Sequence, residues 1–345
     1  MPTKTQKKIR IIDVAEAAGV SKATAVFSLN DRYDISISEP TRQKVKDTAK
    51  QMGYKTNRIA QALSTGKTGM VNIVVPYTND PFFARYIDNL QQLVSQARLT
   101  PIVSANYNED ENAEEFMDRL ISWPCDAYIL CYSKNLAAFL KSKLPGNDHP
   151  IVYIGEKMDD IDSVYSDNKP AISAALQHLL ESKRQDITYV SDRKSLYYIN
   201  DRYALYKSHM KKNGREPVEL VTPKRTRNSA YETTLNHLAN NKPPQAFSCY
   251  DDELAIGVQR AVQDAGYKVP QDVAVTGFDG MSECDFVTPR LTTALYPYQE
   301  MCQAAWDFLQ ARMNDPAREI QTAEFKSHLI IGGSTQMPDR KPCIN

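Results

Sequence analysis

The chain has 345 residues, of which 42% are hydrophobic and 24% charged, with 42 Lys and Arg against 42 Asp and Glu. This length is about twice that of a usual single domain, and the globular composition excludes collagen-like, disordered and coiled-coil classes. The six cysteines and five histidines are dispersed, without CxxC, HxxxH or HExxH spacing, so no metal site and no other cofactor is expected.

The charge is distributed unevenly along the chain. Residues 1–68 carry 13 Lys and Arg against 6 Asp and Glu, a net charge of +7, which leaves −7 on the remainder. A basic end on an acidic body is typical of a protein that presents one end to phosphates. The basic start lacks an apolar stretch long enough for a signal peptide, and no segment approaches membrane-spanning length, so we expect a cytoplasmic protein.

Two short helices joined by a tight turn are predicted first. Gly19 can adopt the positive φ that ends one helix, and Ser21 is a natural N-cap for the next. The turn Ala18-Gly19-Val20-Ser21 therefore indicates a helix-turn-helix, whose second helix is free to enter the major groove. The residues at helical spacing are Ile12, Val14, Ala15, Ala18, Val20, Ala25, Val26 and Leu29.

A third helix and a polar stretch follow. Ser38 is the expected cap of the third helix, Glu39 and Pro40 fill its first turn, and Gly53 ends it. Its predicted inner face consists of Val45, Ala49 and Met52. The next residues, YKTNRIAQALSTGKTG, are too few and too polar to hold a helix alone, so they indicate a linker.

The rest of the chain alternates short β-branched runs with amphipathic helical stretches. The first set comprises MVNIVV, TPIVSA, DAYILC and PIVYI, with helices near 83–98 and 110–121. The second comprises DITYV, VELV, AFSC and VAVT, with helices near 169–182, 201–213, 229–240 and 252–265. This pattern predicts two parallel-sheet lobes, with a ligand in the cleft between them.

Two other classes of protein fit such a fold. An enzyme of sugar or nucleoside metabolism is not favoured, because GxGxxG, GxxxxGK[ST] and GxSxG motifs are absent and the GFDG stretch at 277–280 is too short to cradle phosphate. The DDE stretch at 251–253 shows no partner at a defined distance, so no catalytic residue is assigned. A periplasmic sugar receptor is disfavoured by the absent signal peptide and the attached helix-turn-helix.

The stretches DVAEAAGVSKATAVFSLN and TRQKVKDTAKQMGYKTNRIAQAL resemble the opening of the lac repressor family, also called the LacI/GalR family. The resemblance continues through VPYTNDPFF, DN near 167, DRYALY, DDELAIG, VPQDVAVTGFDG and PRLTT, over nearly the whole chain. It implies phosphate contacts from Ser21, Thr24, Asn30, Ser38 and Thr41, base contacts from Lys22, Ala23 and Phe27, and neighbouring backbone contacts from Tyr54 and Asn57. Arg58, Ala60 and Leu63 complete the implied DNA-binding set.

The chain departs from the family in its recognition helix, where Val26-Phe27 replaces the usual Ser-Arg pair. Phe27 cannot form the bidentate contact that arginine makes to guanine, so it either lies against a thymine methyl or packs in the core. Lys22 is then the remaining candidate for polar base readout, with a phosphate contact as its alternative.

The resemblance also makes the linker a hinge helix that folds when two subunits meet on DNA, with Leu63 wedged into the minor groove. Thr56 stands where the family usually has proline, which weakens the expected start of this helix.

Polar residues fall at the family's effector positions. Arg202, Asp251 and Asp279 match the arginine, the Asn or Asp position and the aspartate that hold effector hydroxyls, a set that suits a polyol. Tyr77, Phe82 and Tyr298 match aromatic positions that pack against the ligand, with core packing as their alternative. Arg225, within the KRTR run at 224–227, either binds an anionic effector or belongs to a solvated loop.

The predicted fold is an all-α helix-turn-helix domain (1–53), a hinge helix and linker (54–68), a core like that of periplasmic binding proteins (69–335) and a tail (336–345). The core is expected to form two doubly wound lobes, an N-lobe at about 69–165 plus 296–325 and a C-lobe at about 166–295 plus 326–335.

The predicted function is transcriptional regulation by a repressor that binds double-stranded operator DNA under allosteric control by an effector, a sugar, sugar acid or sugar phosphate. A homodimer on a near-palindromic operator is expected, because about ten residues after LIIGGST leave no room for a tetramerising helix.

Overall fold

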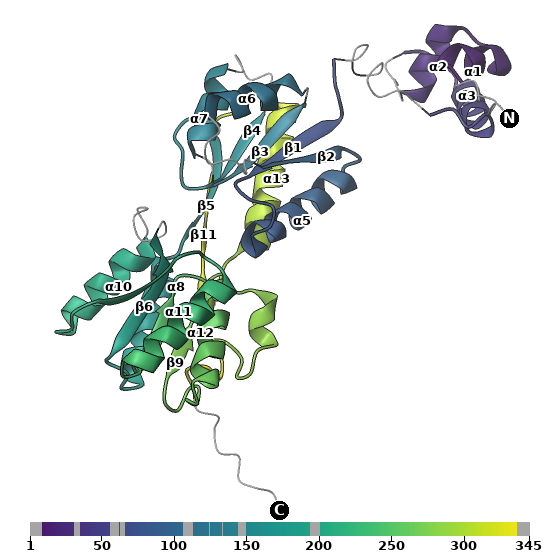
Figure 1. The fold of residues 1–345 in the computed structure, drawn as a ribbon. Coiled ribbons are helices and arrows are strands. Elements are labelled where there is room, and N and C mark those ends of the chain that lie inside the picture. The colour runs from purple at the N-terminus through teal and green to yellow at the C-terminus, as the bar shows by residue number, and fades with distance from the viewer. Residues whose placement is uncertain are drawn as a thin grey trace, which may run out of the picture. The chain divides into compact units, whose positions relative to one another are not determined.

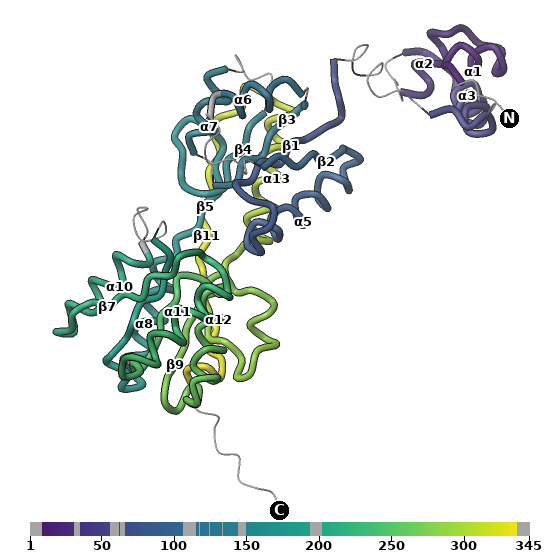
Figure 2. Tube along the Cα trace, viewed as in Figure 1, coloured from purple at the N-terminus to yellow at the C-terminus, as the bar shows by residue number. Residues whose placement is uncertain are grey.

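The computed structural model describes residues 9–30, 35–55, 62, 66–105, 113–123, 125–132, 134–143, 150–193 and 201–336 (Figure 1, Figure 2). The chain divides into two compact units, of which one holds the N-terminal helices and the other nearly all of the α/β part. No helix in the described ranges is long and apolar enough to span a bilayer.

Three short helices form the N-terminal domain: α1 (Ile11–Ala18), α2 (Lys22–Leu29) and α3 (Glu39–Gln51). Gly19 has φ 67°, and the hydroxyl of Ser21 accepts a hydrogen bond from the Thr24 amide at 3.0 Å, so the predicted turn and cap are confirmed. Ser38 is the N-cap residue of α3 but makes no capping bond from its side chain. The shared core consists of Val14, Ala15, Ala18, Ala25, Val45 and Ala49.

The side chain of Arg42, on α3, links the second and third helices of this domain through hydrogen bonds. Its side chain is buried, and its guanidinium donates to the carbonyl of Ile35 at 2.8 Å, of Ile37 at 3.3 Å and of Phe27 at 3.4 Å. A guanidinium is rarely buried unless such acceptors surround it. Arg42 therefore fixes the end of the recognition helix α2 against the start of α3.

The first lobe contains a six-stranded sheet in the order β11-β5-β4-β3-β1-β2. Its strands are β1 (Met70–Val75), β2 (Thr100–Ala105), β3 (Ala127–Cys131), β4 (Ile151–Gly155), β5 (Asp162–Asp167) and β11 (Thr322–Lys326). Its helices are α5 (Pro81–Gln96), α6 (Ala113–Ser122), α7 (Lys134–Lys143) and α13 (Tyr298–Asn314). Helix α5 packs against α13, and α6 against α7, so the sheet carries helices on both faces (Figure 1).

The second lobe contains a four-stranded parallel sheet in the order β7-β6-β8-β9. Its strands are β6 (Ile187–Asp192), β7 (Val218–Thr222), β8 (Ala246–Cys249) and β9 (Ala274–Thr276). Its helices are α8 (Lys169–Glu181), α10 (Asp201–Lys212), α11 (Arg227–Asn240), α12 (Asp252–Asp264) and the short 3-10 helix η1 (Ser282–Asp285). An antiparallel pair, β10 (Thr293–Leu295) and β12 (His328–Ile330), completes the lobe.

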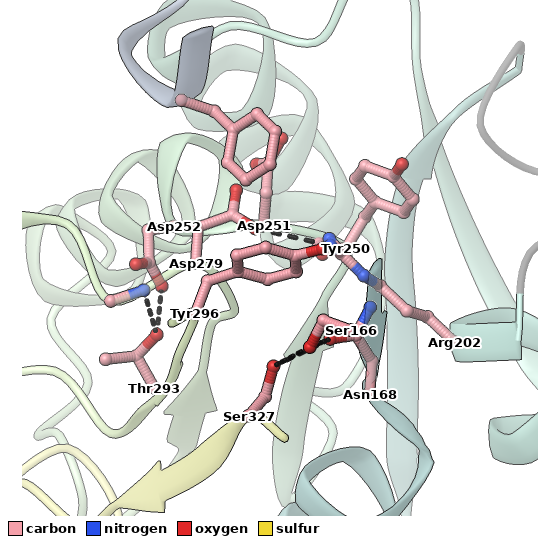
Figure 3. A network of polar contacts seen from close by, with 12 residues as sticks. Ser166, Asn168, Arg202, Tyr250, Asp251, Asp252, Asp279, Thr293, Tyr296 and Ser327 are labelled. Atoms are coloured by element: carbon pink, nitrogen blue, oxygen red, sulfur yellow. Dashed lines mark hydrogen bonds and ion pairs between the residues drawn. The ribbon is translucent and has the colours of Figure 1, made fainter. Parts of the chain in front are cut away.

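The chain passes between the two lobes three times, after β5, after β10 and after β11. At these crossings the Ser327 hydroxyl donates to the side-chain oxygen of Asn168 at 2.6 Å, and the Ser166 hydroxyl donates to the same oxygen at 3.1 Å (Figure 3). One amide oxygen thus ties two crossing strands together. These hydrogen bonds of Ser166, Asn168 and Ser327 lie at the crossings, about which one lobe would rotate relative to the other.

The eight predicted strands and the six helices of the α/β part are confirmed within a few residues. Helix α5 begins at Pro81, two residues before its predicted start, because Asp80 caps it and accepts from the Phe82 amide at 2.9 Å. The elements that were not predicted are α7, α13, η1, β5 and β10 to β12. Strands β5 (DSVYSD) and β11 (TAEFK) are polar, and their parallel pairing makes them strands: β5 pairs with both β4 and β11, and β11 pairs with β5.

Candidate functional site

The recognition helix presents its first turn to solvent. Ser21, Lys22 and Ala23 are exposed, Thr24 and Asn30 are half-buried, and the hydroxyls of Ser38 and Thr41 lie 2.8 Å apart at the start of α3. Tyr54 is half-buried and packs on the core of the three helices. The predicted DNA contacts Asn57, Arg58, Ala60 and Leu63, together with Thr56, lie outside the described residues.

Phe27 is half-buried on α2. The described side chains that pack on the core of the three helices are Ile9, Ile11, Val20, Leu29, Met52 and Tyr54. The half-burial of Phe27 agrees with both interpretations of its ring, contact with a thymine methyl and packing in the core.

We predict that Phe27→Arg will change the operator sequence that the protein prefers, and will not merely weaken binding. An arginine at this position can form two hydrogen bonds to guanine, worth about 1–3 kcal/mol of discrimination. Selection from randomised duplexes by the wild type and the variant measures the preference, and thermal unfolding checks that the variant is folded. If both select the same consensus, Phe27 is part of the domain's core.

Arg202, at the start of α10, is the central residue of the second predicted site (Figure 3). Its guanidinium donates to the carbonyl of Tyr250 at 2.6 Å and to the carboxylate of Asp279 at 3.2 Å. It lies over the ring of Phe278, 3.8 Å from the ring centroid, and 4.6 Å from that of Tyr250. Hydrogen bonds and ring stacking thus hold one orientation of a guanidinium whose side chain is only 15% exposed.

Asp279 faces Arg202 from the GFDG loop. Its backbone has φ 110°, a conformation that side chains other than glycine rarely adopt, and strained residues of this kind gather at binding sites. Burial raises the pKa of Asp279 well above its ordinary value, and Arg202 opposes that shift. The loop therefore presents a carboxylate whose charge depends on the arginine beside it.

Asp251 is the N-cap of α12, where one carboxylate oxygen accepts from the Leu254 amide at 2.9 Å. The other oxygen lies 3.4 Å from Nε of Arg225. Burial raises the pKa of Asp251, and Arg225 opposes this. The predicted site residues Arg202, Arg225, Asp251 and Asp279 are thus brought together by the second lobe, from four separate stretches of chain.

The first lobe contributes rings. Phe82, on the first turn of α5, contacts the rings of Tyr132 and Tyr296 edge-on, with centroid distances of 5.4 Å each. The hydroxyls of Tyr132 and Tyr296 form a hydrogen bond with each other. Phe82 is half-buried and packs against the core cluster of the lobes, as its alternative interpretation predicted.

The two other predicted rings lie further out. Tyr77 is 36% exposed and contacts Phe83 at a centroid distance of 6.4 Å. Tyr298 begins α13 and is half-buried, and the Arg85 guanidinium lies 5.0 Å from its ring centroid. Arg85 also donates to the carbonyl of Gly280 at 2.8 Å, so α5 of the first lobe is joined to the GFDG loop of the second.

The structure adds residues that the sequence interpretation did not include: Asp80, Arg85, Tyr132, Tyr189, Tyr250, Phe278 and Tyr296. Phe278 and Tyr250 are each adjacent to a predicted aspartate, and that adjacency was the available signal for them. Tyr189 gave none. Its hydroxyl is buried without a hydrogen-bond partner among the described residues, and the Arg202 charge opposes the rise in pKa that burial causes.

Little empty space remains beside Arg202. A cavity of about 20 Å³ there is lined by Tyr189, Arg202, Ser248, Thr276 and Phe278, among other residues. A groove of about 770 Å³ lies elsewhere on the second lobe, between the 263–271 and 288–290 segments, and no predicted effector residue lines it. In the described part of the chain, no three His, Cys, Asp or Glu side chains are arranged to hold a metal ion.

Asp252 neighbours the site and is fully buried. It accepts from the Thr293 hydroxyl at 2.6 Å and from the Met281 amide at 2.8 Å, which fastens the GFDG loop to α12 (Figure 3). A Cβ on Gly277 would lie 2.1 Å from its Oδ1, so only glycine fits there. Burial raises the pKa of Asp252 from 3.8 to about 7.

We predict that Asp252 makes the protein less stable as pH rises from about 4 to about 7. The folded protein holds the proton more tightly than the unfolded chain in that interval, so the free energy of unfolding falls by up to about 1.4 kcal/mol per pH unit. Asp252→Asn should flatten this slope in urea titrations over the pH series. Asp264→Asn, at the exposed end of the same helix, is the control, and an unchanged slope in Asp252→Asn contradicts the assignment.

Comparison with known proteins agrees with this arrangement. Residues 10–57 match the model of bacterial regulatory proteins of the lacI family, and residues 176–335 match a periplasmic binding protein-like domain. Catabolite control protein A of Priestia megaterium is 28% identical over 337 residues, covering 95% of this chain and 99% of the relative.

Two solved structures share the fold. A lac repressor dimer bound to operator and the anti-inducer ONPF has a TM-score of 0.80 at 20% identity, and covers 95% of this chain and 99% of its own. A LacI-family transcriptional regulator of Enterococcus faecalis with bound ribose has a TM-score of 0.67 at 21% identity, covering 77% of this chain and 98% of its own. With its helix-turn-helix followed by two parallel-sheet lobes, the chain belongs to the lacI family of bacterial transcriptional regulators.

Proposed function

We propose that this regulator is a repressor whose affinity for operator DNA is controlled by a sugar or sugar derivative bound between the two lobes of its core. The proposal rests on the surroundings of Arg202. Its buried guanidinium stacks on the rings of Phe278 and Tyr250 and lies beside the carboxylates of Asp251 and Asp279. A guanidinium only donates hydrogen bonds and a carboxylate only accepts them, so together they satisfy adjacent hydroxyls of a polyol.

The aromatic side chains support the same class of ligand. Phe82 and Tyr296 offer ring surface from the first lobe, which suits the C–H faces of a sugar. The ribose bound by the Enterococcus faecalis regulator shows that this fold accommodates a pentose, and we transfer only the ligand class to this chain.

The charges around Arg202 favour a neutral sugar over a sugar acid or sugar phosphate. Arg225 pairs with Asp80 and Asp251, and Arg227 with Glu253 and Glu283. The KRTR run therefore has carboxylate partners for both arginines, so it is not an uncompensated basic patch. An anionic effector would have to compete with those carboxylates.

On the DNA side, we propose that two copies of the chain place their α2 helices in successive major grooves of a near-palindromic operator. The exposed Ser21, Lys22 and Ala23 support this, because they are the first residues of the helix to reach the groove. We also propose that the protein acts in the cytoplasm, because the DNA that a bacterial transcriptional regulator binds lies there. We assign it no catalytic step.

A thermal-shift screen of the full-length protein tests the effector proposal. D-ribose, lactose and cellobiose represent neutral sugars, gluconate the sugar acids and glucose 6-phosphate the sugar phosphates. A ligand at a hundred times its Kd stabilises the folded state by about 2.7 kcal/mol, which raises the Tm by several degrees. A hit should then change affinity for the operator selected from random duplexes. If no sugar shifts the Tm, or a hit leaves operator affinity unchanged, effector control is wrong.

A further inference from the structure

Arg225 contacts carboxylates from both lobes at once. It lies in the segment between β7 and α11 of the second lobe, and it forms ion pairs with Asp80 at the start of α5 in the first lobe and with Asp251 at the start of α12 in the second. The side chain of Arg225 is 31% exposed, against 15% for Asp80 and 5% for Asp251. These three residues are called the Arg225 bridge below.

Both carboxylates of the Arg225 bridge are held rigidly. Oδ1 of Asp80 accepts from the Phe82 amide and Oδ1 of Asp251 from the Leu254 amide, each at 2.9 Å. Their Oδ2 atoms are the ones that contact Arg225. Each aspartate thus caps a helix with one oxygen and binds the arginine with the other, so little side-chain entropy is lost when the bridge forms.

The Arg225 bridge occupies the place where a ligand would join the lobes. Asp251 belongs to the proposed effector site, and Phe82, two residues after Asp80, forms its aromatic wall. The Arg225 guanidinium also lies 5.8 Å from the ring centroid of Tyr250, the residue whose carbonyl Arg202 binds. Burial by itself would lower the pKa of Arg225, but Asp251 and Asp80 raise it, so the bridge remains charged.

We propose that Arg225 acts as an internal occupant of the effector site, holding the lobes together without effector and giving way when a small molecule binds. The first part concerns the effector-free protein alone, whereas the displacement step rests on the proposed effector function. Arg225 is therefore a regulatory residue that competes with the ligand and is not a ligand contact.

Asp80→Asn and Arg225→Gln are the variants that test this. Asn keeps the helix cap, because its side-chain oxygen still accepts from the Phe82 amide, and it removes the charge that Arg225 needs. Arg227→Gln is the matched control, since Arg227 also pairs with two carboxylates, Glu253 at 2.5 Å and Glu283 at 3.0 Å, but both belong to the second lobe.

The measurement is hydrogen exchange of the full-length protein without ligand, followed in a peptide that covers the start of α5. Because α5 belongs to the first lobe and Arg225 to the second, we expect Arg225→Gln and Asp80→Asn each to speed exchange there by roughly threefold to tenfold. The double variant should exchange no faster than the single ones, and Arg227→Gln should leave the peptide unchanged. Wild-type exchange in Arg225→Gln, or equal acceleration in Arg227→Gln, would overturn the bridge.

Displacement is tested with the same D-ribose, lactose and cellobiose used as thermal-shift probes. If the ligand must displace Arg225, Arg225→Gln shows a larger Tm shift than the wild type at each sugar concentration. An equal shift would mean that Arg225 does not compete with the ligand, and would overturn the displacement step. A smaller shift would make Arg225 a ligand contact and overturn the displacement step. If no sugar shifts the Tm of either protein, the effector proposal fails, while the exchange result still decides whether the bridge exists.

Discussion

Arg202→Ala should abolish the response to effector while leaving operator binding intact. Arg202 supplies the fixed donors of the site, to the Tyr250 carbonyl at 2.6 Å and to Asp279 at 3.2 Å, and its loss also removes the stacking on Phe278. Truncation of one member of a buried charge pair costs about 2–5 kcal/mol, which corresponds to an effector affinity lower by about thirtyfold or more. Thermal shift and operator titration with increasing effector measure the two parts separately.

Arg202→Lys separates charge from geometry. Lysine keeps the positive charge beside Asp279 but cannot reach two acceptors in one plane or stack as a guanidinium does. We expect Arg202→Lys to be more stable than Arg202→Ala but to bind the effector no more tightly. In Arg202→Ala the unpaired Asp279 should cost more stability at pH 8 than at pH 5, because protonation at low pH neutralises the carboxylate.

The result against this prediction is a full Tm shift in Arg202→Ala. The effector would then bind somewhere other than between the lobes, and the groove of about 770 Å³ on the second lobe, lined in part by Tyr267, Lys268 and Arg290, would be the place to examine. Arg290→Ala would distinguish the two locations, since Arg290 lines that groove and pairs with Asp285.

The local pattern of the sequence was sufficient to predict most of the elements. Gly19 and Ser21 specify the helix-turn-helix through a left-handed φ and a capping hydroxyl, both of which act within four residues. Strands such as β1 (MVNIVV) and β3 (AYILC) are buried on both faces and appear as continuous apolar runs. The strands that were missed, β5 and β11, are defined by their partner strand and not by their own residues.

The site was predicted only as far as the residue types allowed. The family resemblance gave Arg202, Asp251 and Asp279, and their proximity depends on a fold that joins positions 77 residues apart. Arg225 was open to two interpretations, anion binding or a solvated loop, and neither described its contacts. Its partner Asp80 is 145 residues away in the sequence, and no spacing rule links the two.

Removal of residues 1–65 should abolish operator binding and leave effector binding unchanged. The truncated chain loses the three helices and their separate core of Val14, Ala15, Ala18, Ala25, Val45 and Ala49. It keeps Thr68 and Gly69, whose amides donate to Asp126 at 2.7 and 2.9 Å and so fix the start of β1. Specific operator affinity should fall by about a thousandfold or more, to the level of non-specific binding or below.

Operator titration and thermal shift on the same preparation check the two halves of this prediction. The lobes contain two hydrophobic clusters that are separate from the core of the three helices. One includes Val71 and Ile73 and the other Phe247 and Val275, so the truncated chain should remain folded. Arg42→Ala in the full-length chain is the complementary variant, because it removes the guanidinium that donates to three carbonyls inside the DNA-binding domain and alters nothing in the lobes. If the truncated chain still bound operator specifically, DNA recognition would have to reside in the lobes, and the assignment of α2 as the recognition helix would be wrong.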